Sequence, residues 1–467
     1  MFAPKGILSS SPLQAPIEAK LRTGQAAGLS NGVKMVINSL YQLKRLRKNQ
    51  YLSPAELRAL QEERLRGVVR NAYENVPYYR RLFDSAGIRP DDIKTLDDLS
   101  KIPITTKNDL QTLKQEEIVA KGSSIDKCII KYTSGSTGQP LKIFLSPVER
   151  DFQILLNLHI LIENGLRLND KVAYIINPYR FPKSKYWFQY AGILRREYLS
   201  VFDYPEKHVE LLKKIKPDII YGYPSNLTLL ALYIREKGIK GINPKIIFSV
   251  AEALEPRAKN LIDSVMHVNT CDILGTIELG DIAWQCEKRD GYHTNADAVI
   301  IEFLKDGRPA RPGEEGRIVC TSLYGYTMPF IRYAVDDVCV PSDRFCPCGR
   351  TLPMIESIKG RANDFIVLPD GQIIASCFLV IIMQAIHDIG QYRIVQRDKR
   401  QILVQLTKGG EFDPRTPERI KEEIRKVIGS TLEVKVEILE ELGRDESGKI
   451  RTVVSKVIPG MQERMSL

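Results

Sequence analysis

The 467-residue sequence contains no run of eighteen apolar residues, so no membrane-spanning helix is expected. Residues 1–28 lack the apolar core of a signal peptide. Eight cysteines are too few for a disulfide scaffold in a chain of this length, so a reducing, cytoplasmic location is the simplest expectation. The basic residues are scattered and not interleaved with aromatic ones, which argues against a nucleic-acid partner.

What the chain does have is length, apolar content and positive charge. The hydrophobic fraction of 43% allows substantial cores, and 467 residues allow two or three domains. The formal net charge of +11 suits anionic ligands such as nucleotides.

The pattern along the chain predicts an α/β fold. Strand-like runs at 172–176, 219–223 and 245–250 alternate with helical patterns such as 225–237, which favours mixed or largely parallel sheets. After Gly360, paired strand patterns and a helix at 417–428 indicate a small α+β unit. We therefore expect three parts: a partly disordered N-terminal extension over 1–50, a large domain over 51–360, and a small mobile domain over 361–467.

One loop between two apolar runs is rich in hydroxyl groups and glycine, which suits a polyphosphate because backbone N–H groups can turn toward an anion. Its candidate phosphate-binding residues are Thr133, Ser134, Gly135, Ser136, Thr137, Gly138 and Lys142. It is not a Walker A loop, since residues 139–141 separate the last glycine from the lysine, and it lacks the third glycine of a Rossmann fingerprint. The alternative is a polar hairpin loop.

This loop resembles the phosphate-binding motif of the adenylate-forming superfamily, which includes acyl-CoA synthetases. Further matches follow in the expected order at residues 274–278, 329–337, 358–366 and 447–451. Together with Asn75-Val76-Pro77-Tyr78-Tyr79 and Cys346-Pro347-Cys348-Gly349-Arg350, they are most similar to phenylacetate–coenzyme A ligase-like proteins, especially the capsular polysaccharide biosynthesis branch.

The resemblance implies an ATP site. Leu274, Gly275 and Thr276 would contact the nucleotide, and Glu278 would hold Mg²⁺ through carboxylate oxygen. Two positions depart from the family pattern. Leu274 stands where an aromatic residue stacks on adenine, and Ile277 stands where a hydroxyl residue contacts phosphate.

The later motifs imply a ribose anchor, a hinge and a catalytic lysine. Asp337 would accept hydrogen bonds from the ribose hydroxyls. Arg361 would belong to the nucleotide site, and Asn363 with Asp364 would form the hinge between domains. Lys449 would stabilise charge on the reacting oxygens.

A pocket for the acid is expected from residues that follow the parallel strands, where ligands bind in α/β sheets. The candidates are Tyr221, Tyr223, Ser225, Ala251 and Glu252.

Cysteine and histidine spacing predicts a structural zinc site. Cys346 and Cys348 are close in sequence, and Cys286 lies near His293. Four such ligands suit a closed tetrahedral Zn²⁺ site, whereas the alternative is buried cysteines without a metal.

The expected reaction is MgATP-dependent adenylation of a small carboxylic acid, with acyl transfer to a thiol such as coenzyme A. An amine acceptor stays open, and so does a nucleotide-binding scaffold that has lost catalysis. The oligomeric state is also open, with a homodimer as the candidate.

Overall fold

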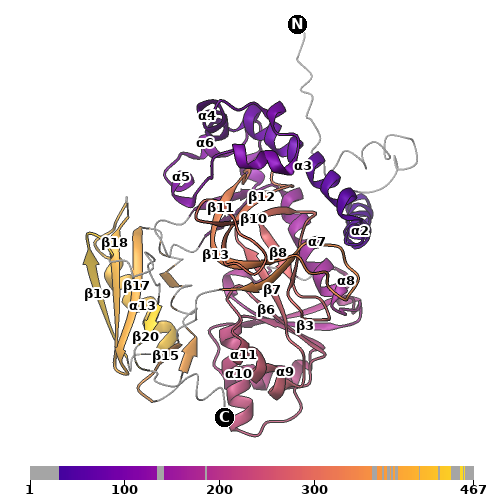
Figure 1. The fold of residues 1–467 in the computed structure, drawn as a ribbon. Helices are drawn as coiled ribbons and strands as arrows, with labels where there is room; N and C mark the ends of the chain where they lie inside the picture. Colours follow the sequence, from indigo (N-terminus) through magenta and orange to yellow (C-terminus); the bar gives the residue numbers. More distant parts are fainter. Residues whose placement is uncertain are drawn as a thin grey trace.

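The computed structural model describes most of the chain (Figure 1). The described residues are 31–133, 141–182, 184, 187–359, 365–370, 373–375, 379, 382–383, 386, 388–409, 411–429, 432–442, 453–455 and 457.

The N-terminal part is helical. Its first elements are α2 (Asn31–Asn49), α3 (Pro54–Asn75) and α4 (Pro77–Ser85). The α3 helix begins where a Ser–Pro pair predicts it, because the Ser53 hydroxyl accepts from the Glu56 N–H and the Glu56 carboxylate accepts from the Ser53 N–H at 2.8 Å. Short elements follow: η1 (Pro90–Asp92), η2 (Leu96–Lys101), α5 (Lys107–Gln111), α6 (Gln115–Ile118) and η3 (Ile125–Lys127).

A two-stranded antiparallel ribbon, β1 (Ile129–Tyr132) with β2 (Lys142–Leu145), flanks the hydroxyl-rich loop. The long helix α7 (Pro147–Glu163) follows it.

A twelve-stranded sheet forms the centre of the molecule, in the order β11-β10-β12-β13-β14-β9-β8-β7-β6-β5-β3-β4. Its first strands are β3 (Lys171–Ile176), β4 (Arg195–Ser200), β5 (Ile219–Gly222), β6 (Ile246–Val250) and β7 (Cys271–Thr276). These five pair in parallel, with crossover helices α9 (Pro205–Ile215), α10 (Pro224–Glu236) and α11 (Pro256–Met266). The short η4 (Pro178–Arg180) and α8 (Trp187–Tyr190) lie between β3 and β4.

The rest of the large sheet is antiparallel, so parallel pairing holds for one half of the sheet only. These strands are β8 (Gly280–Trp284), β9 (Tyr292–Thr294), β10 (Val299–Lys305), β11 (Arg308–Pro309), β12 (Gly316–Ser322), β13 (Tyr333–Ser342) and β14 (Met354–Ile358). Their pairings are antiparallel throughout, beginning with the β7–β8 hairpin.

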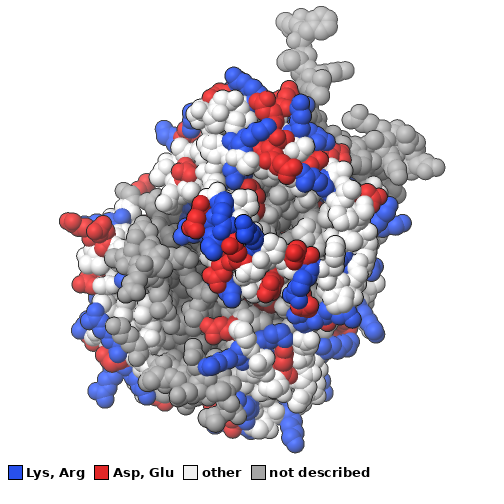
Figure 2. Space-filling model, in the orientation of Figure 1, with Lys and Arg blue, Asp and Glu red and all other residues white. Residues whose placement is uncertain are grey.

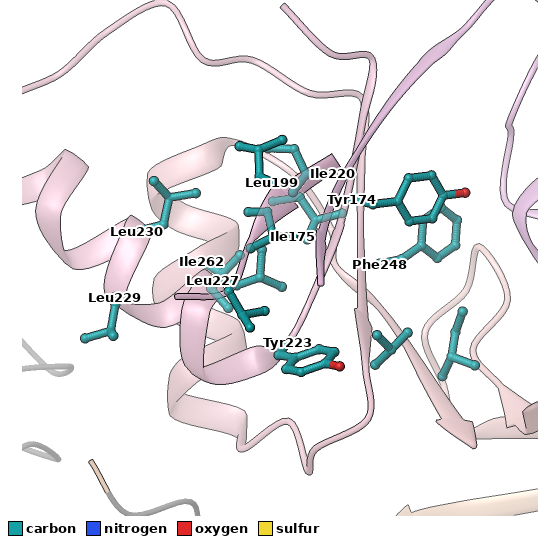
Figure 3. Close-up of a cluster of buried hydrophobic side chains, with 14 of the residues drawn as sticks. Tyr174, Ile175, Leu199, Ile220, Tyr223, Leu227, Leu229, Leu230, Phe248 and Ile262 are labelled. Carbon is teal, nitrogen blue, oxygen red and sulfur yellow. The ribbon is translucent and has the colours of Figure 1, made fainter. Parts of the chain in front are cut away.

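The parallel half buries different side chains on its two faces (Figure 3). Ile175, Leu227 and Ile262 lie on the side of the helices, whereas Tyr174 and Phe248 lie on the other side. This alternation follows from the two-residue period of a strand. One face of the parallel strands is therefore lined with aromatic side chains.

The C-terminal part forms separate small sheets beside the large one (Figure 1). They consist of β15 (Phe365–Val367) with β16 (Ile373–Ala375), and of β17 (Ile389–Asp398), β18 (Gln401–Lys408), β19 (Glu433–Leu439) and β20 (Val453–Ser455). The β17–β18 pair and α13 (Thr416–Ile428) agree with the sequence prediction. The predicted α/β fold class with a small α+β C-terminal unit is confirmed.

Basic and acidic side chains are interspersed on the face shown in Figure 2. The net charge of +11 is therefore not gathered into one basic surface on that face. Of the helices among the described residues, none combines the length and apolarity needed to cross a bilayer.

Candidate active site and metal centre

The two ends of the hydroxyl-rich loop are fastened together. The Thr133 N–H donates to the Leu141 carbonyl oxygen at 3.1 Å, and the Leu141 N–H donates to the Thr133 hydroxyl at 2.9 Å. Thr133 is buried, and these two hydrogen bonds close the base of the loop. The Lys142 ammonium lies 5.1 Å from the centre of the Phe144 ring. The predicted residues Ser134, Gly135, Ser136, Thr137 and Gly138 lie outside the described residues.

Two acidic residues from separate motifs meet beside the β7–β8 turn. Glu278 precedes β8, and Asp337 lies on β13. The Tyr333 hydroxyl, on the same strand as Asp337, donates to the Glu278 carboxylate at 2.9 Å. The structure thus brings together the predicted metal ligand and the predicted ribose anchor, and Tyr333 joins their motifs.

The charge on Glu278 depends on its neighbours. Burial raises the pKa of this carboxyl group, and the nearby Asp337 charge acts in the same direction. The Tyr333 hydrogen bond and the Lys107 ammonium oppose that rise. The oxygen atoms of such paired carboxylates are the ligands that Mg²⁺ prefers.

The nucleotide segment is tightly packed. A Cβ atom at Gly275 would lie 2.9 Å from the Asp281 Oδ1 and 3.2 Å from the Gly280 carbonyl oxygen, so only glycine fits there without movement. The Thr276 hydroxyl accepts from the Leu279 N–H at 3.0 Å. The two departures from the family pattern, Leu274 and Ile277, are partly buried and pack against an apolar cluster.

The residues predicted for the acid pocket lie on neighbouring strands β5 and β6 and in the segments that follow them. Glu252 accepts from the Ser225 N–H at 3.0 Å, so it binds the N-terminal end of α10 and joins the two loops. Ala251 has φ of 69°, a left-handed backbone conformation that is unusual for a residue with a Cβ atom. Tyr223 and Ser225 are buried.

Tyr221 lies within β5, as the strand predicted over 219–223 requires, and not after the strand like the other residues predicted for the acid pocket. Its hydroxyl accepts from the Asn157 side-chain amide at 3.3 Å. The apolar run of β5 conceals this contact, because Asn157 belongs to the distant helix α7.

Four predicted residues cannot be placed. Arg361, Asn363, Asp364 and Lys449 lie outside the described residues. Their roles remain predictions.

The cysteine and histidine residues form a compact cluster. The Cys286 and Cys346 sulfur atoms are 3.6 Å apart, and the Cys348 sulfur is 3.3 Å from the His293 Nε2. The four candidate ligand atoms all lie within 4.8 Å of one another. Tetrahedral zinc with ordinary bond lengths would separate two sulfur ligands by roughly 3.7 Å, so the donor set and its spacing fit Zn²⁺.

The surroundings of the cluster also suit a metal ligand. Burial lowers the pKa of His293 to about 4, which keeps the imidazole neutral at pH 7. Arg350 holds the neighbouring segment in place: it pairs with Glu163 at 2.8 Å and with Glu287 at 3.0 Å, and it lies 5.3 Å from the centre of the Trp284 ring.

Three elements of the site escaped prediction from sequence. Lys107 was not recognised because it lies far from every motif. Tyr333 lies within the 329–337 motif, and the motif predicts a role only for Asp337. The polar contact between Asn157 and Asp281, at 2.9 Å, joins α7 to β8 and has no local sequence signal.

Comparisons with known proteins agree with this architecture. A solved structure of 2-hydroxyisobutyryl-CoA ligase, in complex with 2-HIB-AMP and CoA, superposes with a TM-score of 0.62 over 90% of this chain and 94% of that one, at 21% identity. Residues 366–456 match the CapK C-terminal domain family. The chain therefore has the fold of this acyl-CoA ligase structure, and its C-terminal part carries a CapK family domain.

Sequence relatives narrow the class. The chain is 27% identical over 446 residues to the phenylacetate–coenzyme A ligase of Thermus thermophilus, covering 85% of this chain and 96% of the relative. It is 31% identical over 343 residues to the enzyme of the same name from Pseudomonas putida, covering 67% and 72%. The chain belongs to the phenylacetate–coenzyme A ligase family, as its motifs predict.

Proposed function

We propose that the protein adenylates a carboxylic acid with MgATP, releases pyrophosphate, and transfers the acyl group to a thiol such as coenzyme A. The observation that carries this proposal is the meeting of Glu278, Tyr333 and Asp337 in a chain that belongs to this ligase family. In the first step the substrate carboxylate attacks the α-phosphorus, and pyrophosphate leaves. The protein supplies position and charge rather than a covalent nucleophile.

Each motif has a defined task in this reaction. The loop residues Thr133, Ser134, Ser136, Thr137 and Lys142 bind the β- and γ-phosphates. Glu278 holds Mg²⁺, which neutralises phosphate charge when bound, and Asp337 accepts from the ribose hydroxyls. Lys449 stabilises charge that develops on the α-phosphate.

The acid lies against the loops that follow β5 and β6. The Glu252 contact to the Ser225 N–H supports this placement, because it holds the two loops next to each other at the carboxyl ends of parallel strands. A hinge at Asn363 and Asp364 lets the domain over 361–467 move between the two half-reactions.

We also propose one structural Zn²⁺, bound by Cys286, His293, Cys346 and Cys348. The compact donor set supports it. Four protein ligands leave no open coordination position, so this metal would stabilise the fold and take no part in the chemistry. A cytoplasmic location fits both proposals, since the seven cysteines among the described residues are all unpaired.

Product analysis tests the reaction. The protein is incubated with MgATP, coenzyme A and a panel of carboxylic acids, and nucleotides and acyl products are separated by chromatography with mass detection. We expect acid-dependent AMP, pyrophosphate and acyl-CoA. An ADP product would refute adenylation. AMP without a thioester, with product appearing only when an amine is supplied, would favour an amide-forming ligase. If no acid is turned over, the result would favour a nucleotide-binding scaffold protein that has lost catalysis.

A further inference from the structure

A polar cluster lies behind the nucleotide segment. The Asn157 side-chain amide, on α7, donates to the Asp281 carboxylate of β8 at 2.9 Å and to the Tyr221 hydroxyl of β5 at 3.3 Å. One amide group therefore fixes two polar side chains that come from different parts of the chain. Tyr221 is a predicted acid-pocket residue, whereas Asn157 and Asp281 have no part in the proposed reaction so far.

The cluster spans the two parts of the proposed site. At one end, the Asp281 Oδ1 lies 2.9 Å from the position that a Cβ atom at Gly275 would take, so the carboxylate touches the backbone of the nucleotide segment. At the other end, Tyr221 lies on the strand that leads to Tyr223 and Ser225 in the proposed acid pocket. An acyl group that joins the pocket to the α-phosphate would pass between these ends.

The hydrogen bonding of the cluster is incomplete among the described residues. Asn157 reaches the Asp281 Oδ2, and no described donor reaches the Asp281 Oδ1. The Tyr221 hydroxyl accepts a hydrogen bond from Asn157, and it donates none to an acceptor among the described residues. Both side chains keep part of their surface accessible although burial raises the pKa of each. The cluster thus offers a ligand one acceptor and one donor side by side.

The charges around the cluster favour a neutral ligand. The Lys131 ammonium is close enough to lower the pKa of Asp281, against the effect of burial. Lys131 itself is held by the Gln153 side chain at 2.7 Å. Arg180 and Arg150 also act on Lys131, so an ammonium on the ligand would meet positive charge, and the Asp281 carboxylate repels a second carboxylate placed beside it.

Apolar surface flanks the cluster. The Tyr174 ring lies 5.0 Å from Tyr221 and 5.4 Å from Tyr198, centre to centre, along one row of the parallel strands. These rings suit the carbon skeleton of an acid. Beside them, the Asp281 carboxylate can accept a hydrogen bond and the Tyr221 hydroxyl can donate one.

We infer that Tyr221 and Asp281, held by Asn157, select a hydroxyl-bearing carboxylic acid as the substrate. A hydroxyl group is the neutral substituent that donates one hydrogen bond and accepts another, so it satisfies both open groups at once. An acid without the hydroxyl would cover this acceptor and this donor and leave both unpaired. The inference rests on the proposed adenylation and specifies its substrate class.

Acid-dependent exchange of labelled pyrophosphate into ATP tests this selection. The panel holds 2-hydroxy and 3-hydroxy acids of three to six carbons, each with its unsubstituted counterpart, plus phenylacetate, amino acids and dicarboxylates. We expect the best hydroxy acid to exceed its unsubstituted counterpart in kcat/KM by at least about tenfold, because a site built to bond a hydroxyl rejects the analogue without it. Equal or higher rates with unsubstituted, aryl, amino or dicarboxylic acids would overturn the inference and leave adenylation standing. No exchange with any acid would overturn adenylation itself, and the inference with it.

Tyr221→Phe sharpens the test. The variant lacks the donor and keeps the ring, so the ratio of kcat/KM for the hydroxy acid to kcat/KM for its unsubstituted counterpart should fall by about tenfold. Tyr190→Phe, which removes a hydroxyl from an exposed tyrosine of α8 outside this row of rings, is the matched control and should keep the wild-type preference. An unchanged preference in Tyr221→Phe would contradict the role of this side chain. If Tyr221→Phe does not fold, the wild-type panel alone decides.

Discussion

Two clusters on the same large sheet differ in how complete they are. Cys286, His293, Cys346 and Cys348 bring four soft ligand atoms within 4.8 Å of one another, and three of these residues are buried. Glu278 and Asp337 offer hard oxygen atoms that stay partly accessible, with the Tyr333 hydroxyl as a neighbour. The first cluster can complete a coordination sphere by itself, whereas the second presents carboxylate oxygen atoms of the kind that a nucleotide-bound Mg²⁺ prefers.

The two clusters should therefore respond differently to the substitution of one of their residues. Loss of the closed cluster should lower stability before it alters chemistry. Loss of a group at the open cluster should lower the rate and leave the fold intact. The following predictions separate these outcomes, beginning with the largest.

Lys449→Ala should lower the rate of adenylation by about 10²–10³-fold, because it removes a charge-stabilising donor. The measurement is acid-dependent pyrophosphate exchange, with thermal unfolding in parallel. We expect an unchanged Tm. Lys435→Ala, an exposed lysine of β19, is the matched control and should exchange at the wild-type rate. Wild-type exchange in Lys449→Ala would remove this residue from the mechanism.

Cys348→Ser should release the metal and lower the free energy of unfolding by about 3–5 kcal/mol, since the loss of a metal ligand is among the largest single-residue effects. Elemental analysis of the wild-type protein should find about one zinc per chain, and denaturant titration measures the stability. Cys128→Ser, a half-buried cysteine outside the cluster, should keep both properties. A wild-type protein that is fully folded and free of metal would rule out the zinc site.

Tyr333→Phe should shift the pH dependence of exchange. Glu278 must be ionised to hold a cation, so kcat/KM should fall as the pH drops through its pKa, which burial already raises above the ordinary value. The Tyr333 hydrogen bond stabilises the ionised form, so its removal should move this acid limb to higher pH, by about one unit or less. An acid limb that stays in place, or moves to lower pH, would show that the contact does not act on the reacting form.

Ile277→Thr should have the smallest effect. If the missing hydroxyl limits phosphate contact, restoring it should raise the exchange rate by less than about tenfold. Because Ile277 is partly buried against the apolar cluster, placing a threonine hydroxyl there should lower the free energy of unfolding by about 1 kcal/mol. A slower exchange at unchanged stability would instead place Ile277 in the acid pocket.

Local patterns predicted much of the fold. The strands β3, β5 and β6 and the β17–β18 pair follow from residue periodicity within a few positions. The antiparallel half of the large sheet could not be predicted in this way. For example, β9 pairs with β14, which lies far along the chain, and the sequence of neither strand indicates its partner.

The same limit applies to the sites. The Cys/His cluster was found from sequence because each pair of ligands is close along the chain. The contacts of Glu278 with Tyr333 and Lys107, and of Asn157 with Tyr221 and Asp281, join distant segments, and only the folded chain reveals them.

The central claim is that the open carboxylate cluster supports attack at the α-phosphorus of ATP. The most direct measurement is exchange of labelled pyrophosphate into ATP by the wild-type protein and by Glu278→Gln, with and without hydroxy acids, at matched Tm. The account predicts acid-dependent exchange in the wild-type protein and a large loss in Glu278→Gln without unfolding. Equal exchange in the two proteins, or ADP as the product, would contradict it.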